Sequence, residues 1–154
     1  MAKIGIAGAA ASSTYREPEF GTQNLYDGLG DVDGWLSNVA EWQDAWGRFN
    51  FSEPASVSGV VIWNGFIEAS KADTRDDYYF HKRAQDIEIY FGDDSEPTRL
   101  TLSDSKEPQT HALSTGGPVD KVRVVVKSAY SESPDSAIKP FDVVGFRQFD
   151  WLQE

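Results

Sequence analysis

The segment RDDYYFHKR, residues 75–83, brings ring side chains and polar groups close together in the chain. Within it, Tyr79, His81 and Arg83 combine an aromatic wall with groups that donate or accept hydrogen bonds. Recognition of adjacent hydroxyl groups, as on a saccharide, uses planar donors beside a flat ring. The alternative is structural, with Arg83 paired to a neighbouring carboxylate and one tyrosine covering the core edge. The sequence leaves both interpretations open.

Two further side chains are suited to ligand contact. Trp42 lies between Glu41 and Gln43 in a polar stretch, where its ring could stack on the apolar face of a sugar or cover one end of the fold. Asn64 could offer its amide to a ligand, although the pair Asn64-Gly65 is first of all a turn signal. The candidate ligand-binding residues are therefore Trp42, Asn64, Tyr79, His81 and Arg83.

Three aspartates, Asp27, Asp31 and Asp33, fall within the glycine-containing stretch DGLGDVDG. Calcium takes roughly six to eight oxygen ligands, and glycines allow backbone carbonyls to converge on the ion. The stretch lacks the full EF-hand loop pattern and its terminal glutamate. It predicts either a structural Ca2+ ion held by these aspartates or a solvated turn, and no other cofactor is indicated.

The sequence offers little for catalysis or nucleotide binding. It has no cysteine, and its two histidines, His81 and His111, fit no metalloprotease or nucleophile-elbow pattern. The amino-terminal KIGIAGAAASS is similar to the glycine turn of a dinucleotide-binding fold, but Ala10 and Ser13 occupy the second and third glycine positions. Pro18 stands where the following helix should be under way. We predict no enzyme activity and no nucleotide site.

Short alternating runs separated by turn residues must position these side chains. No segment has a sustained helical period. The pattern predicts an all-β fold, an antiparallel β-sandwich, with long irregular stretches at about residues 12–44 and 66–84, and binding residues usually lie in such loops. The expected strands are found in the segments WGRFNF, VSGVVIWNG, QDIEIYFGDD, TRLTLSD, DKVRVVVKSAY and FDVVGFRQFDW. Alternation puts Phe49 and Phe51 on the face opposite Trp46, Arg48 and Asn50, puts Ile87, Ile89 and Phe91 on one face of their strand, and points Val122, Val124 and Val126 inward with Lys121 and Arg123 mostly outward.

The composition fits a single soluble globular domain over residues 1–154. Hydrophobic residues make up 40% of the chain, yet no run approaches the roughly 18 apolar residues of a membrane-spanning helix. The formal net charge of −11 disfavours nucleic acid and anionic membranes and favours neutral or cationic partners. The amino terminus lacks the strong apolar centre of a signal peptide.

Several motifs occur in the order seen in discoidin, or coagulation-factor type-C, domains. ASS, NLYDG, DGW ending at Trp35 and WGRFNF beginning at Trp46 resemble the first part of that family. VSGVVIWNGF, YYFHKRAQDIEIYFGDD, VRVVVKSAY and SAIKPFDVVGF continue the similarity and look closest to a glycan-binding subgroup. The chain departs from the family before the second tryptophan, where Asp33 or Gly34 replaces the usual threonine.

The resemblance implies a galactose-binding-like jelly roll, the architecture shared by family 32 carbohydrate-binding modules. It also implies a non-catalytic, lectin-like module that binds a neutral glycan or cell-surface saccharide through loops at one end, often with a structural calcium ion. By the same resemblance, Trp35 and Trp46 belong to the core, whereas Trp42 matches no family position.

A second interpretation is a phage virion protein, part of a tail or a capsid decoration. Its sandwich would contact neighbouring virion or self subunits rather than a sugar. Either protein would work at an extracellular or virion surface, and a virion component leaves the cell by lysis and needs no signal peptide. A strict monomer that binds sugar weakly would favour the lone glycan-binding module.

Overall fold

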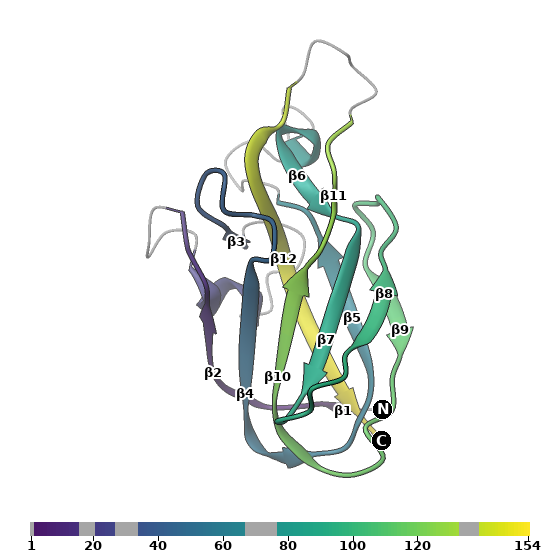
Figure 1. The fold of residues 1–154 in the computed structure, drawn as a ribbon. Coiled ribbons are helices and arrows are strands. Elements are labelled where there is room, and N and C mark those ends of the chain that lie inside the picture. Colours follow the sequence, from purple (N-terminus) through teal and green to yellow (C-terminus); the bar gives the residue numbers. More distant parts are fainter. Residues whose placement is uncertain (1, 16–20, 27–33, 67–76, 133–138) are drawn as a thin grey trace.

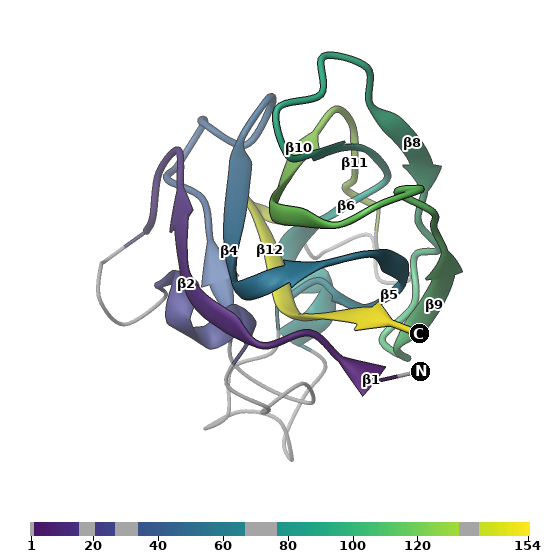
Figure 2. The ribbon, with the colours of Figure 1, turned by 90° about the horizontal axis from the view of Figure 1, so that it is seen from below.

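Two β-sheets pack face to face in the computed structural model, which describes residues 2–15, 21–26, 34–66, 77–132 and 139–154 (Figures 1 and 2). One sheet has the order β2-β4-β10-β7-β8, and the other has the order β11-β6-β12-β5-β9, with β1 and β3 also paired to β12. The strands are β1 (Ala2–Lys3), β2 (Ile6–Ala11), β3 (Trp35–Leu36), β4 (Trp46–Ala55), β5 (Val57–Asn64), β6 (His81–Ala84), β7 (Asp86–Phe91), β8 (Thr98–Thr101), β9 (Gln109–Ala112), β10 (Val119–Val126), β11 (Ala129–Tyr130) and β12 (Phe141–Gln153).

The β-sandwich predicted from the alternating pattern is confirmed. Among the strands that the structure describes, every pairing is antiparallel except that between β6 and β12, which the sequence did not predict. The described residues form no α-helix, only the short 3-10 helices η1 (Thr22–Leu25) and η3 (Asp77–Phe80). Within these residues, no helix has the length and apolar character needed to cross a membrane.

The strands β4, β7 and β10 bury the residues that the alternation assigned to the interior. Each buried apolar side chain contributes roughly 1.5–3 kcal/mol relative to an exposed one. This inner face therefore fixes the register of the three strands, and with it the positions of the residues that point outward. The inward residues are Phe49, Phe51, Ile87, Ile89, Phe91, Val122, Val124 and Val126.

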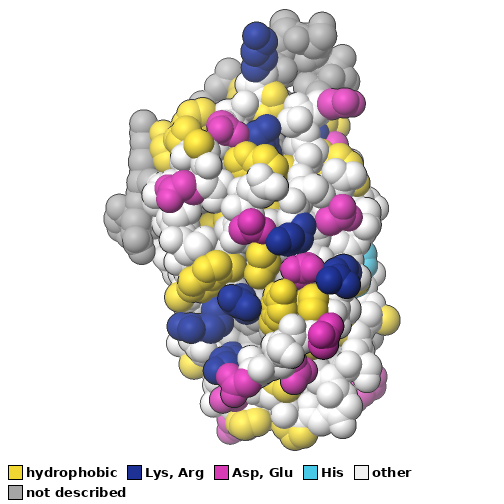
Figure 3. Space-filling model, in the orientation of Figure 1, with side chains coloured by type: hydrophobic (Ala, Val, Ile, Leu, Met, Phe, Trp, Pro, Cys, Tyr) yellow, Lys and Arg dark blue, Asp and Glu magenta, His cyan; other side chains and the backbone are white. Residues whose placement is uncertain are grey.

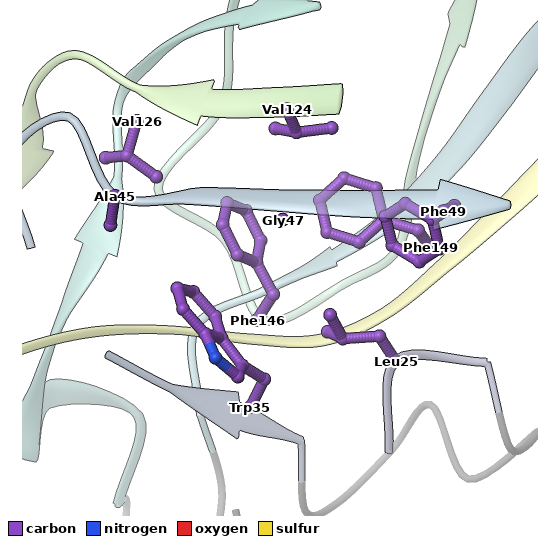
Figure 4. Close-up of a pocket in the computed structure, with 9 residues that line it drawn as sticks. All are labelled: Leu25, Trp35, Ala45, Gly47, Phe49, Val124, Val126, Phe146 and Phe149. Carbon is purple, nitrogen blue, oxygen red and sulfur yellow. The ribbon is translucent and has the colours of Figure 1, made fainter. Parts of the chain in front are cut away.

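Trp35 lies in the core, as predicted, with 2% of its surface exposed. Its ring stacks on Phe146 with 6.3 Å between ring centroids, and its indole N–H donates to the carbonyl of Ser13 at 3.0 Å. Figure 4 shows both rings beside a small apolar void of about 10 Å³. Because the void has room for about one water and its lining is apolar, it is core space rather than a ligand site.

The assignment of Trp46 to the core is wrong, because this residue is only partly buried. Side chains alternate between the two faces of a strand, so Trp46 shares the outer face of β4 with Arg48, whereas Phe49 points inward. Trp151 on β12 is the interior indole instead, 1% exposed and 5.6 Å from the Phe49 ring between centroids.

The strand β2 contains the glycine motif that is similar to a dinucleotide-binding turn. It pairs antiparallel with β4 at the edge of its sheet. A dinucleotide-binding fold begins with a strand inside a parallel sheet, so this arrangement agrees with the rejection of a nucleotide site. The two chain ends lie together, since Ala2 pairs with Gln153. The opposite end of the molecule carries β6, β11 and the connections around them (Figure 1).

Candidate functional site

Four segments far apart in sequence meet at the end of the sandwich opposite the termini, here named the loop end (Figure 1). The Asn38 amide donates to the Ser13 hydroxyl at 3.1 Å, and the Ala40 amide donates to the Asp142 carbonyl at 2.9 Å. These bonds tie the loop before β4 both to the segment after β2 and to the start of β12. The loop end comprises residues 12–15, 37–45, 77–82 and 139–142.

A buried polar network supports the loop end from below. Arg83 of β6 has no exposed side-chain surface and makes two hydrogen bonds to the carboxylate of Asp104, at 3.0 and 2.8 Å. Its guanidinium also donates to the backbone carbonyl of Glu132 at 2.5 Å and lies 4.9 Å from the ring centre of Tyr79. The Tyr78 hydroxyl donates to the same carboxylate at 2.6 Å.

Burial and charge shift the acidities within this network. Burial raises the pKa of the Tyr78 hydroxyl, and its hydrogen bond to Asp104 raises it further. Burial alone would raise the pKa of Asp104, but hydrogen bonds from Arg83 and Tyr78 outweigh it and hold that pKa below its usual value. The network is therefore a charged carboxylate enclosed by two donors, which joins three segments of chain.

Arg83 thus has the structural environment considered as the alternative in the sequence. With no exposed surface, it has no route to direct ligand contact in this structure. We assign it a positioning role, because its guanidinium holds the Tyr79 ring and the carboxylate of Asp104 beneath the surface.

Asn64 is also fully buried. Its side-chain amide donates to the Ala84 carbonyl at 2.8 Å, and its side-chain oxygen accepts the Gly65 amide at 2.9 Å. Gly65 has a φ of +78°, and a Cβ there would lie 2.6 Å from a ring carbon of Tyr78. The Asn-Gly pair therefore acts as the turn that its sequence indicates, and Asn64 positions the end of β5 against β6.

Tyr79 and His81 are partly exposed at the loop end. The Tyr79 ring meets Tyr78 edge to face, with 5.0 Å between centroids. His81 lies opposite Phe141 in the parallel pairing of β6 with β12, and its ring is 5.1 Å from that of Phe66. Both candidates therefore lie near the surface, although the Nδ1 atom of His81 is buried.

Trp42 brings the loop before β4 into contact with β6, the strand that contains Lys82. Its ring is partly exposed, packs against the core cluster and lies 5.4 Å from the Lys82 ammonium. That ammonium is 3.9 Å from the Asp142 carboxylate. Trp42 therefore covers part of the core, which was one of the two roles considered for it, and its stacking on a sugar stays a prediction.

Three residues of the loop end were missed in the sequence. Val39 and Phe141 are the large hydrophobic side chains found exposed among the described residues, at 46% and 41%. The Tyr15 ring meets Phe141 edge to face at 5.5 Å between centroids. Exposed rings beside charged groups form the kind of surface on which a sugar ring can lie.

The loop before β4 also borders a polar hollow of about 270 Å³. Ala40 and Asp44 in this loop have φ values of 63° and 61°, a left-handed conformation that is costly for a residue with a side chain. Hydroxyl, amide and carboxylate oxygens face the hollow and could bind hydroxyl groups. The hollow is lined by Ser12, Ser13, Glu41, Gln43, Asp44 and Ala45.

The three aspartates predicted to hold calcium, Asp27, Asp31 and Asp33, lie outside the described residues. Within the residues that the structure describes, no group of three or more histidine, aspartate or glutamate side chains is arranged to hold a metal ion. The calcium site stays a prediction.

Comparison with known proteins identifies the fold. Neither a scan against protein-family models nor a search of curated proteins finds a match. The family 32 carbohydrate-binding module of AlyQ, solved in complex with 4,5-unsaturated mannuronic acid, is 12% identical over 100% of both chains, with a TM-score of 0.69. The family 32 module of NanJ from C. perfringens, solved in complex with galactose, is 12% identical over 94% of this chain and 91% of that one, with a TM-score of 0.63.

A third solved structure comes from the other family named by the sequence motifs. The F5/8 type C domain of a Bacteroides fragilis protein is 14% identical over 100% of this chain and 99% of that one, with a TM-score of 0.62. The chain therefore has the galactose-binding-like β-sandwich fold of family 32 carbohydrate-binding modules and coagulation-factor type-C domains, as its motifs predicted.

Proposed function

We propose that this protein is a non-catalytic carbohydrate-binding module that contacts a saccharide with its loop end. Solved structures with the same fold include modules in complex with galactose, GalNAc and an unsaturated mannuronic acid. The observation that carries the proposal is the loop end itself, where the exposed Phe141 and the partly exposed Trp42 and His81 lie beside the charged groups of Lys82 and Asp142.

The chemistry of this surface matches a sugar better than an ion or a nucleotide. Aromatic rings can stack on the apolar C–H face of a pyranose, while the neighbouring ammonium and carboxylate can bind its hydroxyl groups. A neutral glycan is the proposed partner because the chain carries a net charge of −11. Such a module would work at an extracellular or virion surface, where glycans are displayed.

A glycan array followed by calorimetric titration tests the proposal. Replacement of His81 or Tyr79 by alanine should abolish binding of the array's best ligand. Trp63→Ala is the matched control, because it removes a partly exposed ring from the outer face of β5. If no glycan binds, or if the loop-end variants bind as well as wild type, the proposal is wrong.

The array should be run with and without calcium, because a metal held by Asp27, Asp31 and Asp33 would stabilise the folded state. Calcium in tenfold excess over its dissociation constant should raise unfolding stability by about 1.4 kcal/mol, seen as a higher melting temperature. Asp31→Asn should remove that increase. An unchanged melting midpoint in wild type with calcium would leave the solvated turn as the explanation of the three aspartates.

A further inference from the structure

A basic groove lies on the outer face of the five-stranded sheet, over β4, β10 and β7. It has a volume of about 270 Å³. Figure 3 shows Lys and Arg side chains gathered over this part of the sheet. This groove, here named the sheet groove, is lined by Arg48, Tyr90, Gly92, Asp93, Lys121 and Arg123.

Strand register fixes the arrangement of the groove. Arg123 of β10 lies directly opposite Arg48 of β4 on one side and directly opposite Tyr90 of β7 on the other. All three side chains point away from the core, because their neighbours in each strand, such as Phe49 and Val122, point inward. The guanidinium of Arg123 lies over the Tyr90 ring, 4.7 Å from its centre.

The charges of the groove are not balanced within the protein. Like charges directly opposite each other on neighbouring strands are unfavourable. Among the described residues, no carboxylate lies within ion-pair distance of the guanidinium of Arg48 or Arg123. Of the three cations that line the groove, Lys121 has an ion-pair partner among the described residues, with its ammonium 2.9 Å from the carboxylate of Asp93.

The imbalance is unexpected in this chain. Acidic residues outnumber basic ones, 25 against 14, so carboxylates to neutralise two adjacent arginines are plentiful. Arg48 also lies near enough to Lys121 to act against its positive charge, although the hydrogen bond that Lys121 donates to Asp93 raises the Lys121 pKa overall. An external anion would relieve the repulsion that the fold leaves in place.

We propose that the sheet groove is a second saccharide site, which binds the carboxylate of a uronic acid. Arginine forms paired hydrogen bonds with a carboxylate, and two of them at adjacent strand positions could hold one carboxylate from both sides. The Tyr90 ring offers an aromatic wall for the pyranose, and the volume of the groove suits one sugar residue better than a larger ligand.

The site is separate from the loop end, and its failure would leave the proposed function untouched. The loop end lies at one end of the sandwich, whereas the groove lies on the outer surface of β4, β7 and β10. A chain with both sites could bind a polysaccharide that carries neutral and uronic acid residues at two points, which raises affinity without any new contact.

Calorimetric titration with trigalacturonate tests the proposal, with a neutral galactose trimer titrated in parallel. Wild type should bind trigalacturonate, with an affinity that falls as salt is raised. Arg123→Gln should weaken binding about tenfold or more, because it removes a charge-assisted contact. The double variant Arg48→Gln/Arg123→Gln should show no binding. Arg48→Lys keeps the charge and should retain part of the affinity.

Three controls make the result decisive. Lys3→Gln removes an exposed cation on β1, which belongs to the other sheet, and should bind like wild type. Trp42→Ala should keep trigalacturonate binding, which separates the groove from the loop end. Each variant is also melted to show that it folds. Binding that survives in the double variant, no binding by wild type at low salt, or preference for hexaglutamate over trigalacturonate would overturn the proposal, the last indicating an acidic protein partner.

Discussion

Arg83 and Arg48 show two ways in which this molecule holds a positive charge. Arg83 is fully buried beneath the loop end, where the carboxylate of Asp104 and the rings of Tyr78 and Tyr79 surround it. Arg48 is exposed on β4 and faces a second arginine, and among the described residues no carboxylate lies within ion-pair distance of it. The fold depends on the first charge and tolerates the second. A charge that folding does not neutralise is available to a partner.

The same arginine-to-glutamine substitution in the two regions should change the free energy of unfolding in different ways. Arg83→Gln should destabilise the protein by about 3 kcal/mol, since it leaves a partly buried carboxylate without its cation. Urea unfolding, with Arg99→Gln as the exposed control, measures the loss. A loss below about 1 kcal/mol would contradict a supporting role for the buried network.

The carboxylate of Asp104, in the buried network with Arg83 and Tyr78, should make the free energy of unfolding depend on pH. The folded-state pKa of Asp104 is lowered, so its contribution is present above the unfolded-state pKa and is lost as pH falls through the folded-state value. Asp104→Asn should cost about 3 kcal/mol at neutral pH, because it leaves the fully buried guanidinium of Arg83 without its anion. Unfolding of both proteins at pH 7 and at pH 2–3 should show the difference shrinking in acid.

Tyr78 should have the opposite dependence. Its folded-state pKa is raised, so the stability that it contributes is lost as pH rises through the pKa of an unfolded tyrosine, about 10. Tyr78→Phe should lose stability less steeply than wild type above that pH. Equal slopes for the two proteins would show that Tyr78 is not shielded in the folded state.

The sequence predicted the outer face of the five-stranded sheet better than it predicted the loop end. Alternation along β4 and β10 is a local signal, and it correctly separated Phe49 and Val122 from the outward positions of Arg48 and Arg123. The same alternation placed Trp46 on the face of Arg48, opposite Phe49, yet the family resemblance assigned it to the core. The local physical signal was right there, because strand parity leaves no choice once Phe49 is buried.

The loop end could not be predicted in the same way, because long-range contacts create it. Trp42 meets Lys82 from a distant part of the chain, and His81 meets Phe141 through the parallel pairing of β6 with β12. No local pattern encodes either contact. The burial of Arg83 was also undecided, since the four-residue strand β6 is too short and too polar for its period to assign an inner face.

The two proposed saccharide sites can be separated by one substitution in each. Trp42→Ala should weaken binding of the loop-end ligand at least tenfold, because truncating an aromatic anchor typically costs more than 1 kcal/mol, and should leave trigalacturonate binding unchanged. Arg123→Gln should do the reverse. Calorimetry with both ligands on both variants gives the four values required. If each variant lost both ligands, the two surfaces would form one extended site.

The substitution of Arg48 should change stability least, and the sign of that change distinguishes the groove from the loop end. Arg48→Gln should stabilise the free protein by about 0.5 kcal/mol, because it removes the repulsion from Arg123 across the strand pair. Arg83→Gln destabilises, so one chemical change has opposite signs in the two places. Raising the salt concentration in urea unfolding should reduce the Arg48→Gln gain, since surface charges are screened. A loss of stability in that variant would show that Arg48 already has a favourable partner in the folded protein, and the groove would then have no unbalanced charge to offer a uronate.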